Sequence, residues 1–352
     1  MGITIGRLQK FGVAKRGTTL PTVPLTAGTF LQPTQMIRFT PPLDWDQTIN
    51  VLPSEAISGV RELPTKAVKG SAELKGKKIV GEVEPSDWLG MQLQAAFGQD
   101  SVSGNGTSSA HAHNFQSVDS AALPTYDFWL TKTNKQFGFG AMMMAKFDLN
   151  YNKGERLKIE TEWDGLYYVD GLSVSPTASF PSTQPGTWAQ CQAWFAGSQV
   201  LNVSQAHISI VNHTVAEHFL RDDTNQASMV WSEGQEVNFD AEFLFEDTTE
   251  YNKFLNVSSD SQLSGSSFRL LFTSADKYTE GSLNEAYKLD IVLPSTFYKK
   301  AAITLPTGVV KVKVEGGTLP AITTIGSGGN AYLLTTARLA VAQYINGSST
   351  QY

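Results

Sequence analysis

The sequence predicts a mainly β protein made of two tandem β-sandwich or barrel units, each with one short flanking α-helix. Composition is the first indication, because only 17% of the 352 residues are charged and Ser, Thr, Asn and Gly are abundant, which is typical of exposed β structure. The second is an alternation of apolar and polar side chains over several stretches. The third is a motif that occurs twice, in which a strand runs into a short amphipathic helix.

These patterns divide the chain into four segments. Residues 1–42 contain five prolines and no sustained period, so we expect an N-terminal arm that packs on an adjacent subunit and not within its own domain. Residues 43–172 are expected to form the first β unit and residues 201–352 the second. A Pro/Ser/Thr-rich stretch within residues 173–200 is expected to connect them.

The first copy of the motif begins at Gly81 and continues through Glu82 and Glu84 into a helix. Ser86 or Asp87 can cap the helix N-terminus, and Gly98 is expected to end it. Residues 99–112 are polar and rich in Gly and Ser, and they are expected to form a loop. The helix is too short to be stable alone, so it should pack on its sheet through Trp88, Leu89, Leu93 and Phe97.

The next element predicted is a long antiparallel hairpin. Residues 143–151 and 157–163 both alternate between apolar and polar side chains, and Asn152-Lys153-Gly154 lies between them as a turn. The second arm has a charged face formed by Arg156, Lys158, Glu160 and Glu162.

The second copy of the motif starts at Gly234, and every second residue from Val237 to Phe245 is apolar. This period indicates a half-buried strand. Its opposite face carries the four candidate functional residues, Glu236, Asp240, Glu242 and Glu246. Asp247 and Glu250 then resemble a capping box, and the helix that follows is expected to bury Tyr251, Phe254 and Leu255.

Charge and cysteine content restrict the class of function. A formal net charge of −6 argues against a protein that grips nucleic acid, because phosphate binding needs clustered Lys and Arg. Cys191 is the only cysteine, so a disulfide framework is excluded and a reducing compartment is expected. The N-terminal 20 residues lack a continuous apolar run, so neither a signal peptide nor a membrane span is expected.

The residue patterns do not indicate catalysis, a metal or a cofactor. His111 and His113 could share one side of a strand, but no third ligand stands at a recognisable spacing. Carboxylate pairs such as Glu160 and Glu162 occur on solvated strands, and no nucleophile motif accompanies them. The aromatic residues of 126–139 favour packing in a sheet over base stacking. A secreted carbohydrate-binding β-sandwich stays open as an alternative, and a hydrolase on a β scaffold is a weaker one.

The order of these features resembles the tail tube (major tail) proteins of long-tailed bacteriophages. The resemblance covers roughly residues 40–345. Its motifs are the glycine-led strands, the helix entries at 87–89 and 247–251, the strand at 123–128, the hairpin at 139–142 and the stretch 207–212.

The resemblance implies a structural virion protein. The resemblance to duplicated members of this family implies trimers with pseudo-sixfold symmetry. Their rings close a β-barrel and stack into a tube. The expected partners are copies of this chain and the tape-measure and tail-terminator proteins, with DNA passing through unbound and no membrane involved. Assembly is expected in the cytoplasm of the bacterial host.

Two interpretations of the acidic strand face stay open. Glu236, Asp240, Glu242 and Glu246 could line the channel, where like charge would disfavour adsorption of DNA. The same side chains could equally solvate an outer face.

Overall fold

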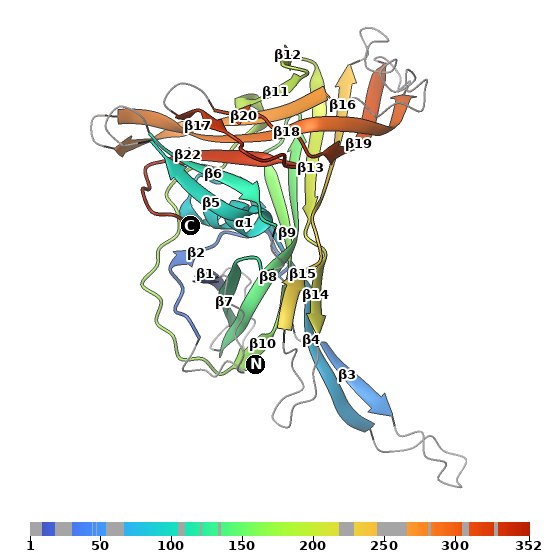
Figure 1. The fold of residues 1–352 in the computed structure, drawn as a ribbon. Helices are drawn as coiled ribbons and strands as arrows, with labels where there is room; N and C mark the ends of the chain where they lie inside the picture. The colour runs from blue at the N-terminus through green and yellow to red at the C-terminus, as the bar shows by residue number, and fades with distance from the viewer. Residues whose placement is uncertain are drawn as a thin grey trace.

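The protein is described by a computed structural model that is mainly β (Figure 1). The structure describes residues 9–17, 30–43, 45–46, 48–53, 67–104, 110–119, 122–132, 135–217, 229–244, 266–280, 283–304, 310–326 and 330–352. Its elements in the N-terminal half are β1 Lys10–Gly17, β2 Gln35–Met36, β3 Thr48–Pro53, β4 Ala67–Glu82, α1 Asp87–Phe97, β5 Gly98–Ser103, β6 His111–Ser117, β7 Thr125–Lys132, β8 Lys135–Asn152, β9 Lys158–Gly165 and β10 Tyr167–Asp170.

The C-terminal half adds a short 3-10 helix and twelve strands within the described residues. These are η3 Trp188–Gln190, β11 Cys191–Phe195, β12 Ser198–Val200, β13 Val203–Val211, β14 Thr214–Glu217, β15 Met229–Ser232, β16 Glu236–Leu244, β17 Ser266–Glu280, β18 Leu283–Thr304, β19 Lys311–Leu319, β20 Thr324–Ile325, β21 Tyr332–Leu333 and β22 Val341–Asn346.

One hydrogen-bonded sheet of 18 strands contains strands from both halves of the chain. Seven of its strands follow one another in the order β4–β9–β8–β13–β16–β19–β18, and every neighbouring pair among them is antiparallel. Figure 1 shows β8, β9, β13 and β16 standing side by side, with β17, β18 and β22 running across their upper end. We call β4, β9, β8, β13, β16, β19 and β18 the seven-strand wall.

Strands from the two halves of the chain also pair elsewhere in the sheet. β22, near the end of the chain, pairs with β6 as well as with β18. Residues 191–200, in the stretch expected to connect the halves, form β11 and β12, and β11 pairs with β17. The boundaries of the two expected units stay a prediction.

Residues 10–17 contradict the expectation that the N-terminal segment cannot be buried within its own chain. They form β1, which pairs with β7 from Lys10 to Gly17. Phe11 and Val13 are fully buried, and the Phe11 ring stacks on Phe128 at a centroid distance of 5.4 Å. Trimming the chain before Phe39 would therefore remove core side chains, and we expect the trimmed protein to fail to fold.

Residues 99–112 are also not a simple loop. Gly98–Ser103 and His111–Ser117 form the antiparallel pair β5–β6, and the polar residues Asp100, His113 and Asn114 are buried in it. The sequence patterns did not indicate these strands because their buried positions are polar: Asp100 pairs with His113, and Asn114 donates to the Ser101 carbonyl. Gly81 likewise lies near the end of β4, which begins at Ala67, and does not start a strand.

The first helix confirms the predicted caps. The Ser86 side chain accepts a hydrogen bond from the Leu89 N–H, and Gly98 adopts a φ of 96° that glycine tolerates. The hairpin of β8 and β9 is confirmed as well, with Gly154 at a φ of 87° in its turn. The second predicted helix, at residues 247–255, lies outside the described residues.

An aromatic core joins the wall to the N-terminal strands. The Trp163 indole packs against Phe128, Tyr126 and Trp88, with ring centroids 4.8, 5.6 and 6.2 Å away. Trp45 contacts Phe128 from another side at 4.9 Å. The Trp88 and Trp163 rings are stacked and the other three pairs are edge-to-face, and both geometries add to the stabilisation from burial alone.

Gly90 provides space on α1 for the ring of Tyr352. A Cβ at position 90 would overlap that ring. The Tyr352 hydroxyl donates to Asp87, and the Tyr352 backbone N–H donates to Asp100. Gly→Ala in an open helix position stabilises by about 1 kcal/mol. Here we expect Gly90→Ala to lower the free energy of unfolding by about 1–3 kcal/mol, because overpacking displaces the ring.

The control for this prediction is the same substitution in a Tyr352→Ala background. Without the ring, Gly90→Ala should become neutral or stabilising in denaturant unfolding. An equal loss in both backgrounds would contradict the proposed contact.

Candidate functional site

The seven-strand wall has one apolar and one charged face. Ile79, Ile159, Ile208, Phe239 and Val314 are buried on the apolar side. Their sequence neighbours point to the other side, because successive side chains alternate across a strand. We define the charged face by the residues paired across it: Lys78, Lys146, Asp148, Glu160, Glu162, His207, Asp240, Glu242, Lys300, Lys311, Lys313 and Glu315.

Glu242 and Asp240 are both paired with lysines of the neighbouring strand β19. Lys311 Nζ lies 2.6 Å from Glu242 Oε1, which also accepts a hydrogen bond of 2.6 Å from Ser204. Burial raises the pKa of Glu242, but Lys311 and Ser204 outweigh it and hold the pKa below its ordinary value. Lys313 Nζ lies 3.8 Å from Asp240.

Asp240 has a second partner on the other side, the imidazole of His207. His207 Nδ1 lies 2.9 Å from Asp240 Oδ2, and Nε2 lies 3.1 Å from Asp148 Oδ1. Burial lowers the pKa of His207, but the two carboxylates outweigh it and raise the pKa to about 9. Asp148 also accepts from Lys146, 2.7 Å away, and its pKa falls to about 2 against the opposing effect of burial.

Glu236 lies at the exposed start of β16. Its carboxylate is 3.6 Å from both His213 and Lys299. A hydrogen bond from Asn238 is the main reason that the pKa of Glu236 lies below its ordinary value. Glu246, the fourth predicted carboxylate, lies outside the described residues.

The pairing extends to the N-terminal part of the wall. Lys78 Nζ lies 2.8 Å from both Glu160 and Glu162, and hydrogen bonds to these carboxylates raise the pKa of Lys78. The predicted charged hairpin arm is therefore part of the same surface as β16.

The charged face is balanced and not simply acidic. Its six carboxylates face five lysines and His207. The alternation of Lys311, Lys313 and Glu315 with Val312 and Val314 is visible in the sequence, but nothing in the sequence indicated that β19 lies beside β16. The sequence patterns therefore did not identify the lysines of β19 as partners of the acidic residues of β16.

The helix residues predicted to pack on the sheet in the first unit are buried. Trp88, Leu89, Leu93 and Phe97 are at most 8% exposed and belong to the main core. Tyr251, Phe254 and Leu255, their expected counterparts, lie outside the described residues.

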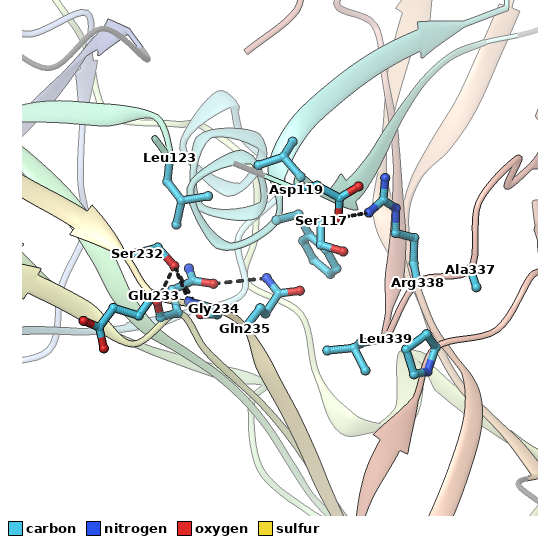
Figure 2. A pocket seen from close by; sticks show the side chains of 14 residues that line it. Ser117, Asp119, Leu123, Ser232, Glu233, Gly234, Gln235, Ala337, Arg338 and Leu339 are labelled. Carbon is cyan, nitrogen blue, oxygen red and sulfur yellow. Dashed lines mark hydrogen bonds and ion pairs between the residues drawn. The ribbon is translucent and has the colours of Figure 1, made fainter. Parts of the chain in front are cut away.

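The C-terminal end of α1 is tied to the C-terminal half of the chain. Side-chain amides of Asn212 and Gln235 both donate to the Ala96 carbonyl, at 3.1 and 3.0 Å. Beside them lies a pocket of about 470 Å³, in which Arg338 pairs with Asp119 at 2.8 Å (Figure 2). Helix carbonyls at a C-terminus need such donors, so this contact fixes the two halves to one another.

The other candidates from the sequence have structural roles. His113 is buried, with its Nδ1 3.0 Å from Asp100 and its Nε2 3.0 Å from the Ser348 carbonyl. Burial raises the pKa of the Cys191 thiol to about 12, which makes it a poor nucleophile. Among the described residues, no three His, Cys, Asp or Glu side chains are grouped to hold a metal ion.

The described part of the chain contains no helix that is long and apolar enough to cross a membrane. A family model described as phage tail tube protein matches residues 6–331. No curated protein matches the sequence.

Proposed function

Since the chain belongs to the phage tail tube protein family, we propose that it polymerises as stacked rings into the tail tube that conducts DNA from the capsid to the host. The family supports a structural role in the virion tail. Catalysis has no part in the proposal.

The observation that carries the proposal is the seven-strand wall. One chain supplies seven neighbouring antiparallel strands with a core on one face and ion pairs on the other. A few copies of such a wall, set edge to edge, would close a wide barrel. We propose that the charged face lines the channel.

A balanced wall suits the passage of DNA. Duplex DNA carries one charge per ~1.7 Å of its axis, so weak attractive contacts repeated along a tube would retard it. The lysines of the charged face lie 2.6–3.8 Å from carboxylates. A phosphate would therefore have to displace an existing partner, and the net attraction stays small.

The ring is proposed to contain three subunits, whose edge strands complete the sheet. Within the described residues, β12 has no strand partner other than β11, and residues 74–82 of β4 have none other than β9. On the open side of β4, the Lys78 and Val80 carbonyls accept hydrogen bonds from Trp45 and Thr40 of the same chain. Strand edges without a strand partner are templates for pairing with another chain. Tape-measure and tail-terminator proteins are the proposed further partners, with assembly in the host cytoplasm.

Electron microscopy of the purified full-length chain tests this function. We expect stacked rings with threefold symmetry. Protein that stays monomeric at high concentration would refute tube formation, and sixfold rings of the full chain would refute the three-subunit arrangement.

A further inference from the structure

We propose that His207 is a positively charged bridge that fastens β8, from the N-terminal half of the chain, to β16, from the C-terminal half. β13 carries His207 between these two strands. The proposal concerns the folding of the single chain and does not depend on tube formation.

Hydrogen-bond geometry carries the proposal. Each ring nitrogen of His207 faces a carboxylate oxygen, Asp240 at 2.9 Å and Asp148 at 3.1 Å. A carboxylate can only accept, so both nitrogens must donate, and an imidazole donates from both only when it is protonated. A neutral ring would place a nitrogen lone pair against an oxygen lone pair on one side.

Lysines lie beside both carboxylates. On β8, Lys146 lies 2.7 Å from Asp148, and on β19, Lys313 lies 3.8 Å from Asp240. Glu160 on β9 is the cross-strand neighbour of Asp148, and Glu242 on β16 is paired with Lys311. Each carboxylate that contacts His207 therefore also contacts a lysine.

The consequence is that the contact of His207 with Asp148 and Asp240 stabilises the fold more below pH 6.5 than above pH 9. The folded-state pKa of His207, about 9, lies above its ordinary 6.5. Its contribution to stability is therefore complete below pH 6.5 and is lost as the pH rises through 9. Once the ring is neutral, Asp148 and Asp240 face each other across β13 without a cation between them.

Nuclear magnetic resonance of the isotope-labelled full-length protein tests the bridge directly. The sequence has five histidines, so variants that each lack one histidine assign the ring signals. We expect both His207 nitrogens to be protonated at pH 7.5 and the ring to titrate near pH 9. A neutral ring at pH 7.5, or titration near 6.5, would overturn the proposal even if no variant at this position folds.

Thermal unfolding between pH 6 and 10 provides a second readout. His207→Gln should lower the unfolding midpoint most at pH 6, and its difference from the wild type should shrink as the pH passes 9. The matched control is His213→Asn, which removes an exposed histidine beside Glu236 at a position with a φ of 41° that Asn tolerates. Equal pH profiles for the two variants would contradict a special role of His207.

Discussion

Replacing Trp163 by alanine is expected to lower the free energy of unfolding by about 3–5 kcal/mol. The side chain is fully buried and joins the seven-strand wall to α1 and β7 through its contacts with Trp88, Tyr126 and Phe128. A loss of that size is a large share of the roughly 5–15 kcal/mol by which domains are stable. Urea unfolding of the unassembled protein would measure it.

Trp188 provides the matched control, because it is the same residue type but is 36% exposed. Trp188→Ala should cost well under half as much as Trp163→Ala. Similar losses for the two variants would mean that the aromatic core around Trp163 is not what holds the wall in place.

The second large effect is expected from reversing charge on β16. Glu236→Lys, Asp240→Lys and Glu242→Lys together raise the net charge by six, which cancels the formal −6 of the chain. The apolar face of the strand is untouched, but Lys299, Lys311 and Lys313 lose their carboxylate partners on β16. If this face lines the channel, DNA ejection should slow by at least about tenfold, since about 1.4 kcal/mol of added barrier is enough.

A charge-swap variant separates DNA attraction from damage to the fold. Adding Lys299→Glu, Lys311→Glu and Lys313→Glu to the triple reversal restores opposite charges between β16 and its partners on β18 and β19, with the original net charge. Both variants lose the contact between Asp240 and His207, so that loss cannot explain a difference between them. Ejection from particles carrying the swap should return toward the normal rate. Normal ejection with the triple reversal alone, in tubes confirmed to contain it, would exclude the lumen assignment.

Local patterns predicted local structure well. The caps of α1 at Ser86 and Gly98 follow from side-chain chemistry within a few residues. The alternation in 236–244 predicted β16 with its buried and exposed sides. Both signals are contained in one segment, so the sequence alone was sufficient.

Long-range pairing was not predictable in the same way. β1 is held in the sheet by β7, over a hundred residues away, and its seven buried or part-buried residues follow no simple period. β5 and β6 bury Asp100 and His113 against each other. Composition alone predicts a loop for most of this segment. The balance of the charged face also depends on β19 lying beside β16. Each of these features requires knowledge of which strands meet.

The most direct test of the central claim is a cryo-electron microscopy map of the assembled tube, fitted with this chain. We expect His207, Asp240, Lys311 and the rest of the charged face to point toward the tube axis, with Phe239 and Val314 away from it. A map in which the charged face lies on the outer surface, or against a neighbouring subunit, would contradict the account.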